Sequence, residues 1–415
     1  MIRKAGYLGV GVVLGAAAAA TAPQALLFVS PAAYAAAADT YRQLNLFGDV
    51  FDKIRNDYVE KPDESKLIEA AINGMLSSLD PHSSYMDAKS FRDMQVQTKG
   101  EFGGLGIEVT QEDGLLKVVR GPKKEAKDFT IVRDLIHVQS VRSHVEDGDI
   151  GYIRITQFTE QTGDGLKSAM DKLHSEIPAD KFKGYILDLR NNPGGLLDQS
   201  IDVVNSFVDR GEIVSTRGRT ADETQRFDAK PGGDLSGGKP LVVLINGGSA
   251  SASEIVSGAL QDHKRATLIG TRSFGKGSVQ TIMPLGENGA LRLTTARYYT
   301  PSGRSIQAKG IEPDIKVLED VPDDLKGKDD MKGEASLKGH LANGAEDTSA
   351  SQAYVPPNEK DDKQLTAAID LLHGVKHPEP AVKADAAPVK SDQPAATTTS
   401  PAPTDPGQAT PAKPN

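Results

Sequence analysis

Between residues 135 and 318 short apolar runs alternate with amphipathic stretches, and this alternation constrains the fold more than any other feature of the chain. The runs of strand length are 151–158, 184–189 and 241–245, and the stretches with helical spacing are 166–173, 197–208 and 251–263. Strands that alternate with helices build an α/β domain, and its functional loops follow the strand ends. We therefore predict an α/β domain over residues 135–318.

The N-terminus has the composition of an export signal. Arg3 and Lys4 precede an uncharged stretch from Ala5 to Ala38 that is rich in small residues, as in a secretory signal before its cleavage site. We predict that residues 1–35 are a signal peptide. An uncleaved single-span membrane anchor is the alternative, because the apolar stretch is long enough for either.

Composition and charge exclude several function classes. The 415 residues include no Cys, so the chain has no disulfide, thiolate nucleophile or Cys-ligated metal. The formal net charge of −9 is too acidic for the broad basic surface of a protein that reads nucleic acid. The segment 270–277 has the spacing of a phosphate-binding loop, but Gly277 stands where that loop needs Ser or Thr. We predict no nucleic-acid partner, no metal and no cofactor.

Four other segments differ in composition from the α/β domain. Residues 36–98 have two amphipathic stripes with helical spacing, and residues 99–134 form a Gly-rich β pattern. Residues 319–377 are predicted to be a polar linker that ends in a short docking helix. Residues 378–415 are rich in Pro and Ala and have no aromatic residue, so they bury too little apolar surface to fold and are predicted to be a disordered tail.

The turn that follows the apolar run 241–245 is a candidate site for a nucleophile. Gly247 and Gly248 lead into Ser251 at the start of a helical stretch. A hydroxyl at a helix start lies near the positive end of the helix dipole, where developing negative charge is stabilised. The competing interpretation is a capping box, because Ser251 and Glu254 fit the pattern S-x-x-E.

Lys276 is the candidate base. It lies between Gly275 and Gly277, and a desolvated Lys at such a position has a lowered pKa and can accept a proton from a Ser hydroxyl. An ordinary solvated Lys is the alternative. Gln280 would orient the amine, and because residues four apart on a straight strand are about 13 Å apart, the backbone has to bend near Gly277.

Histidine is a less suitable base in this sequence. His263 lies at the far end of the helix that begins at Ser251, about 18 Å away by helical rise. His82 belongs to a turn, Asp80-Pro-His-Ser, that we predict to end a helix. A third strand end, around Gly194 and Gly195, is a Gly-rich turn whose N–H groups could complete an oxyanion hole with the Ala252 N–H.

Four ordered blocks resemble the carboxy-terminal processing peptidases, also called tail-specific proteases. They are Asp188-Leu-Arg-Asn-Asn-Pro-Gly-Gly, Gly248-Ser-Ala-Ser-Ala-Ser-Glu, Ser273-Phe-Gly-Lys-Gly-Ser-Val-Gln280 and Thr300-Pro-Ser-Gly-Arg-Ser-Ile, with Gly310-Ile-Glu-Pro-Asp after them. The resemblance implies a crotonase-like (ClpP/crotonase) α/β protease core. It assigns Ser251 as nucleophile, Lys276 as general base and Gln280 as its positioning partner. The implied oxyanion hole is the Ala252 N–H with that of Gly194 or Gly195.

The same resemblance implies partners and a location. The substrates would be exported proteins or peptides with accessible C-termini, and the location the bacterial periplasm, with the inner membrane as a further site if the N-terminal segment anchors the chain. Self-association and binding of a helical-repeat adaptor are two further hypotheses for the helical stripes.

One segment departs from the family pattern. Members carry a PDZ domain, whereas residues 99–134 number too few to sustain an independent core. The loop residues Gly104, Leu105, Gly106 and Ile107 are the candidates for binding a substrate carboxylate, but peptide capture by strand addition needs a second wall. We therefore expect a truncated PDZ-like segment.

Two functions follow from these observations. The first is a serine endopeptidase that cleaves exported proteins near their C-termini. The second is a catalytically impaired binding or scaffold protein that kept the fold after losing most of the PDZ domain. Ser251, Lys276 and Gln280 favour the first, because a binding module has no need of a Lys between two glycines.

Overall fold

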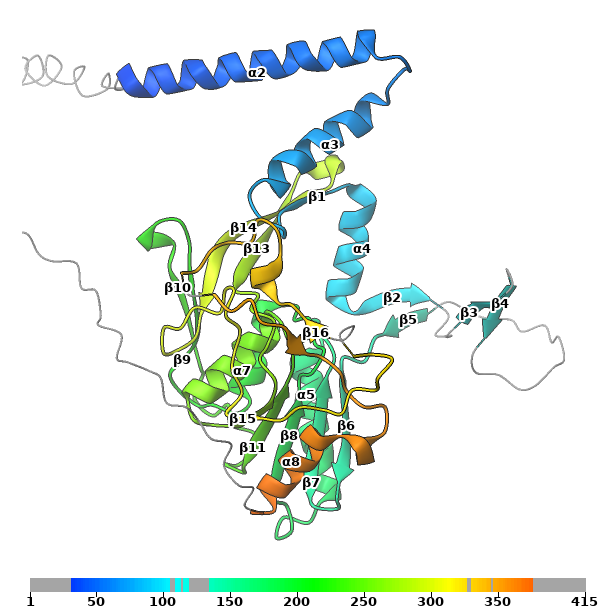
Figure 1. The fold of residues 1–415 in the computed structure, drawn as a ribbon. Coiled ribbons are helices and arrows are strands. Elements are labelled where there is room, and N and C mark those ends of the chain that lie inside the picture. Colours follow the sequence, from blue (N-terminus) through cyan, green and yellow to red (C-terminus); the bar gives the residue numbers. More distant parts are fainter. Residues whose placement is uncertain are drawn as a thin grey trace, which may run out of the picture. The chain divides into compact units, whose positions relative to one another are not determined.

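The computed structural model describes residues 31–104, 109–112, 115–118, 134–326, 330–344 and 346–375 (Figure 1). Several predictions concern residues outside this set: most of the signal peptide, the loop residues Leu105, Gly106 and Ile107, and the tail 378–415. Within the described ranges, no helix is both long enough and apolar enough to span a membrane.

A six-stranded sheet forms the centre of the α/β domain, in the order β15, β12, β11, β8, β7, β6. Neighbouring strands are parallel except β6 and β7, which are antiparallel. The strands are β6 (Val141–Glu146), β7 (Ile150–Ile155), β8 (Gly184–Asp188), β11 (Leu241–Ile245), β12 (Thr267–Gly270) and β15 (Ile315–Lys316). The helices are α5 (Thr162–Glu176), α6 (Leu197–Asn205), α7 (Ala252–Asp262) and α8 (Lys363–Leu372). The predicted α/β domain is confirmed.

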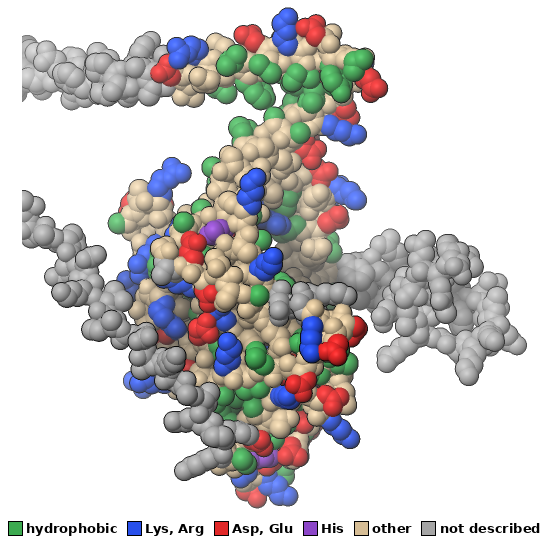
Figure 2. Space-filling model, in the orientation of Figure 1, with side chains coloured by type: hydrophobic (Ala, Val, Ile, Leu, Met, Phe, Trp, Pro, Cys, Tyr) green, Lys and Arg blue, Asp and Glu red, His purple; other side chains and the backbone are tan. Residues whose placement is uncertain are grey.

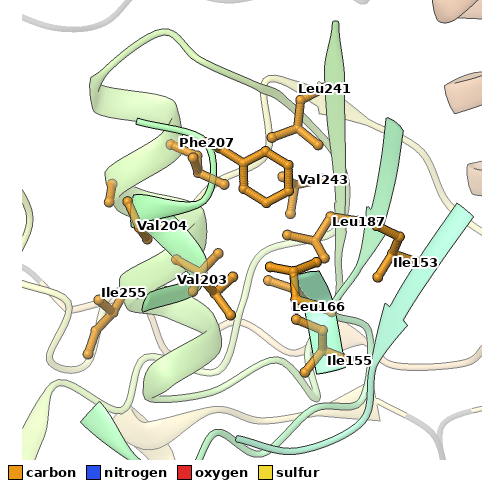
Figure 3. Close-up of a cluster of buried hydrophobic side chains, with 14 of the residues drawn as sticks. Ile153, Ile155, Leu166, Leu187, Val203, Val204, Phe207, Leu241, Val243 and Ile255 are labelled. Atoms are coloured by element: carbon orange, nitrogen blue, oxygen red, sulfur yellow. The ribbon is translucent and has the colours of Figure 1, made fainter. Parts of the chain in front are cut away.

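Both faces of this sheet are buried, and alternate strand residues belong to different faces. Leu187 and Val243 contribute to the cluster that includes α5, α6 and α7, whereas Ile186 and Val242 contribute to the cluster that includes α8. Figure 3 shows the first cluster, with Val203, Val204 and Phe207 packed against strand side chains. Burial of each large aliphatic side chain contributes about 1.5–3 kcal/mol, so this core holds the strand ends rigidly.

A second, antiparallel sheet has β14 (Ala290–Tyr299) as its central strand. Its other strands are β1 (Ser84–Met86), β9 (Glu212–Arg217), β10 (Gln225–Asp228) and β13 (Ser278–Pro284). β13 pairs with β14 along its whole length, and the register shifts between Val279 and Gln280. On the opposite edge of β14 from β13, β1 pairs with the first three residues of β14 through Ser84, Tyr85 and Met86. A strand from the N-terminal region is thereby part of the sheet that carries Gln280.

From residue 31 onward, where the description of the structure begins, the α/β domain is preceded by α2 (Pro31–Asp57), α3 (Glu64–Ser77) and α4 (Ala88–Lys99). Asp63 and Asp87 cap α3 and α4 by accepting backbone N–H groups of Lys66 and Ser90. The predicted stripe on α2 is present but exposed: Leu44 and Phe47 are 58% and 53% exposed, and α2 has apolar side chains along one side in Figure 2. α3 ends at Ser77, three residues earlier than the Asp80-Pro81 pair.

The remaining elements are short. Strand β2 (Glu101–Gly104) pairs with β5 (Asp134–His137), β3 (Val109–Glu112) with β4 (Leu115–Val118), and β16 (Asp330–Met331) with β17 (Ser351–Gln352). Short 3-10 turns are η1 (Ala221–Glu223), η2 (Gly286–Asn288), η3 (Glu334–Ser336) and η4 (Glu359–Asp361).

The polar segment after residue 318 differs from the linker that its composition predicts. Glu319, Glu334 and Ser351 are all buried, and helix α8 packs on the sheet through Leu365 and Ala368. The polar residues of the segment after residue 318 serve as hydrogen-bond partners for the domain, which explains how so polar a stretch is ordered.

Candidate active site

Ser251 lies at the turn between β11 and α7, with φ 55° and ψ −112°. A positive φ in a residue with a side chain is strained, and such strain concentrates at functional sites. The turn requires glycine at position 248, because a Cβ there would lie 2.3 Å from Asn191 Oδ1. Ser251 is only 9% exposed. A strained and close-packed turn therefore holds this hydroxyl at the start of α7.

The same turn is a capping box, as the S-x-x-E pattern predicts. Both reciprocal contacts between Ser251 and Glu254 are present, and the Ser251 N–H donates to Glu254 Oε2 at 2.7 Å. The cap fixes the backbone of residue 251 and leaves the residue at the positive end of the helix dipole. The capping and the nucleophilic interpretations of Ser251 therefore do not exclude each other.

Glu254 joins the Ser251 turn to the loop that carries Lys276. Its buried carboxylate accepts four hydrogen bonds. Oε1 accepts from Ser273 Oγ at 2.5 Å and the Gly275 N–H at 2.6 Å, and Oε2 accepts from the N–H groups of Ser251 and Lys276 at 2.7 and 2.9 Å. A single oxygen atom therefore bridges the backbone nitrogens of the proposed nucleophile and base.

Burial raises the pKa of Glu254 to about 7, whereas the four donors favour the ionised form. Sequence reasoning assigned Glu254 only to the helix cap and missed this second role. In the sequence, Glu254 stands out only as part of the capping-box pattern, and this pattern does not reveal that a distant loop also donates hydrogen bonds to its carboxylate.

Lys276 is half-buried, and its Nζ donates to Gln280 Oε1. Gln280 Nε2 in turn donates to Ser278 Oγ at 3.0 Å and Thr294 Oγ1 at 3.1 Å, which directs the amide oxygen toward the amine. The Gly277 N–H donates to Gly275 O at 3.1 Å, so the backbone turns at Lys276, close to where the bend is predicted, and the register of β13 shifts further along, between Val279 and Gln280. Burial lowers the pKa of Lys276, because desolvation disfavours the charged ammonium.

The Gly-rich turn after β8 lies against the start of α7. Gly194 has φ 99°, and a Cβ there would lie 2.8 Å from Ser251 Cβ and 2.9 Å from the Ala252 nitrogen. The Gly194 N–H donates to Asn192 Oδ1 at 2.9 Å. Gly195 is exposed, and its turn is tied to Phe158 by bonds of Gly194 O and the Leu196 N–H. The structure therefore brings Gly194 and Ala252 beside Ser251 and engages the Gly194 N–H with Asn192, whereas the atoms nearest to Gly195 belong to Phe158.

Asp188 and Arg190, from the first block, form a buried ion network. Arg190 Nη2 lies 2.8 Å from Asp188 Oδ2 and 2.8 Å from Asp362 Oδ2. Asp362 caps α8 by accepting the Leu365 N–H. The lowered pKa of Asp188 reflects its charged partners Arg190 and Arg154, which outweigh the effect of burial. These residues anchor α8 to the strand end that precedes the glycines.

Two other groups of residues bear on ligand binding. Of the candidate carboxylate-binding loop, Gly104 ends β2, and Leu105, Gly106 and Ile107 lie outside the described residues.

Among the described residues one cluster could hold a metal ion, with the ligand atoms of His144, Glu146 and Glu359 within 4.8 Å of one another. An ion pair of His144 with Glu146, at 2.9 Å, explains the same placement.

The arrangement around Ser251 is suited to acyl transfer. Its parts are a hydroxyl at the start of α7, the Ala252 N–H next to it in the chain, and an amine whose pKa is lowered by burial and which an amide oxygen orients. Glu254 joins the two segments, because its carboxylate accepts the backbone N–H groups of both Ser251 and Lys276. These are the parts that a nucleophile, a general base and an oxyanion hole require.

Two family models match the chain. Residues 149–317 match the model described as peptidase family S41, a range that contains five strands of the six-stranded sheet, all but β6, together with Ser251, Lys276 and Gln280. Residues 19–90 match the model of the activating protease CtpB N-terminal domain.

Two relatives are named carboxy-terminal processing proteases. A carboxy-terminal-processing protease of Bartonella bacilliformis is 53% identical over 390 residues, which cover 81% of this chain and 89% of the relative. The carboxy-terminal processing protease CtpA of Bacillus subtilis is 34% identical over 329 residues, which cover 66% of this chain and 69% of the relative. A solved structure titled photosystem II D1 C-terminal processing protease matches at a TM-score of 0.45 and 24% identity, over 68% of this chain and 95% of that chain.

Proposed function

Because this chain belongs to the carboxy-terminal processing proteases of peptidase family S41, a group of serine-type peptidases, we propose that it cleaves exported proteins near their C-termini with a Ser251–Lys276 dyad. The observation that carries the proposal is the shared carboxylate oxygen of Glu254. It receives the backbone N–H groups of both residues and so keeps the nucleophile and the base in one rigid frame.

The proposed first step is attack of Ser251 Oγ on the carbonyl carbon of the scissile bond. The neutral Lys276 amine accepts the hydroxyl proton and later donates it to the leaving amine, and water then hydrolyses the acyl-enzyme. Gln280 Oε1 accepts one N–H of Lys276. This bond orients the amine, so that its lone pair is free for the Ser251 proton.

The proposed oxyanion hole consists of the N–H groups of Ala252 and Gly195. Ala252 is the first residue of α7, so its N–H has no acceptor within the helix. Of the two candidate glycines, Gly194 already donates to Asn192 Oδ1. This engagement favours Gly195 as the second donor, and donors of this kind contribute about 3–4 kcal/mol each to the transition state.

We further propose that residues 99–134 are a shortened PDZ-like segment with a reduced contribution to substrate selection. The Bartonella alignment runs over 390 residues yet takes in only 81% of this 415-residue chain. The relative therefore has residues within the aligned region that this chain lacks, in keeping with a deletion. Cleavage should accordingly depend little on a free substrate carboxylate at the loop that contains Gly104.

The location and partners remain part of the proposal. Residues 1–35 favour export to a periplasm, with membrane anchoring as the alternative. The exposed apolar side chains of α2, among them Tyr41 and Leu44, are where we would seek self-association or a helical-repeat adaptor.

The alternative function, a scaffold without catalysis, is separated from the protease by one experiment. The mature protein and a Ser251→Ala variant are incubated with an unfolded protein substrate, and C-terminal fragments are identified by mass spectrometry. We expect fragments only with the unaltered protein. Equal fragmentation by both, or none by either across a range of substrates, would leave the scaffold as the better reading.

A further inference from the structure

The turn between α3 and β1 is unusually well bonded for a surface connection. Asp80 is only 3% exposed. Its Oδ1 accepts the N–H groups of His82 and Ser83 at 2.8 Å each, and its Oδ2 accepts Ser83 Oγ at 2.8 Å. We refer to residues Asp80–Ser83 as the 80–83 turn. Its internal bonds make it a rigid unit at the end of the N-terminal helices.

One arm of hydrogen bonds leads from this turn to the amine of Lys276. Ser83 Oγ accepts the Thr294 N–H at 3.1 Å. Thr294 Oγ1 accepts Gln280 Nε2 at 3.1 Å, and Gln280 Oε1 accepts Lys276 Nζ. Only Thr294 and Gln280 stand between the turn and the proposed base.

A second arm leads to the backbone around Lys276. His82 Nε2 lies 2.8 Å from Oε2 of Glu334, a residue that is 1% exposed. The Glu334 N–H donates to Phe274 O at 2.9 Å, on one side of Lys276. Glu334 Oε1 accepts Gln307 Nε2 at 3.0 Å, and Gln307 Oε1 accepts the Gly277 N–H at 3.1 Å, on the other side.

The charges that face Lys276 come from several elements. Glu334 in η3, Glu254 in α7 and Asp80 in the turn are acidic, and Arg292 in β14 is basic. His82 and His340 face the Glu334 carboxylate in turn. A buried carboxylate near Lys276 favours the ammonium form and so opposes the neutral amine that the reaction needs.

We propose that the 80–83 turn and Glu334 are positioning elements for the base. They hold Lys276 and Gln280 in place from two sides and set the charge that the amine meets, and they couple the N-terminal helices to catalysis. The link to these helices continues through α3, where Asn73 Oδ1 accepts the Tyr85 N–H at 3.1 Å. This inference rests on the proposed role of Lys276 as the base.

The test is the pH dependence of kcat/KM for the mature protein and for Glu334→Gln, His82→Ala and His82→Gln. Glu334→Gln keeps an acceptor for its neighbours but removes the charge. We expect the rising limb of the profile to move to lower pH by about one unit. His82→Ala should lower kcat about tenfold with little change in KM, and His82→Gln, which keeps a donor, should restore most of the loss.

His373→Gln is the matched control. His373 Nε2 bonds to Asp149 Oδ1 at 2.9 Å, a comparable imidazole–carboxylate pair at the end of α8. We expect its kcat and pH profile to equal those of the unaltered protein. Two results would overturn the proposal. One is a Glu334→Gln protein whose pH profile of kcat/KM has its rising limb at the same pH as the unaltered protein. The other is an equal kcat for His82→Ala and His373→Gln.

Two further variants keep the test decisive. If Glu334→Gln does not fold, as judged by thermal unfolding, Ser83→Ala tests the other arm, and unchanged kcat there overturns the proposal. Lys276→Ala separates the two levels of inference. An active Lys276→Ala protein refutes the dyad itself, whereas an inactive one combined with an unmoved limb in Glu334→Gln refutes only the positioning role.

Discussion

The two halves of the proposed dyad are built in different ways. Ser251 is held by its own segment, in which β11, a glycine turn and α7 follow one another within the chain. Lys276 bonds directly to Gln280 and Glu254, and the bonds that support Gln280 and the backbone around Lys276 come from η3, β14 and the 80–83 turn. Glu334 and His82, which pair in this support, are 252 residues apart in sequence. A nucleophile can thus be local, whereas the burial and the charges that set the pKa of an amine come from distant segments.

The largest effect should come from removing either member of the dyad. Lys276→Ala and Ser251→Ala should each lower kcat/KM by about 10⁴-fold or more, because the two residues act as a unit and the loss of either one removes the function of both.

The stability of Ser251→Ala should differ from that of Ser251→Gly. Glycine relieves the strain of the positive φ at residue 251, so this inactive variant should be about 1 kcal/mol more stable than Ser251→Ala. Urea unfolding measures the difference, and equal stabilities would show that the turn stores no strain.

Glu254→Gln tests the link between the Ser251 turn and the Lys276 loop. It should lower kcat/KM about a hundredfold, because an amide NH₂ would face N–H donors.

The activity of the unaltered protein should depend on pH with a definite sign. The pKa of Glu254 is raised to about 7, so as pH falls below 7 the carboxylate gains a proton and becomes a weaker acceptor for the donors that place Ser251 and Lys276. The lowered pKa of Lys276 makes the neutral amine available as pH rises. Both effects make activity increase with pH.

Stability should respond to the same carboxyl in the opposite sense. Because the folded pKa of Glu254 lies above the unfolded value, the folded state binds the proton more tightly. The contribution of this group to stability is therefore greatest below pH 4.5 and is lost as pH rises through about 7. Denaturation of Glu254→Gln and unaltered protein across this range checks the sign, and parallel curves would contradict the raised pKa.

The smallest effects are expected from two variants, one of a residue that orients the Lys276 amine and one of a residue in the helix that begins after Ser251. Gln280→Ala removes the acceptor of the Lys276 amine and should lower kcat/KM about tenfold with a small change in stability. Ser253→Ala removes a buried bond to Asn192 O and should cost about 1 kcal/mol of stability with kcat/KM unchanged. The comparison between the halves fails if Ser253→Ala reduces activity as much as Gln280→Ala does.

Several predictions from sequence hold because they depend on neighbouring residues. The alternation of strands and helices and the capping box at Ser251 are confirmed. The turn at Lys276, in which the Gly277 N–H donates to Gly275 O, agrees with the bend predicted near Gly277. The stretch after residue 318 was predicted to be a polar linker with a docking helix, and helix α8 does pack on the sheet. Composition alone does not reveal that Glu319 and Glu334, in the same stretch, are buried as hydrogen-bond acceptors.

The sequence by itself determined the strand-turn-helix that presents Ser251 and the Lys placed between two glycines, since backbone geometry and helix capping act over a few residues. Only the tertiary structure decided what surrounds that Lys. The donation of the Lys276 N–H to Glu254 and the bond of His82 to Glu334 depend on which distant segments lie side by side. Burial and charge act through space, and the order of residues along the chain does not specify them.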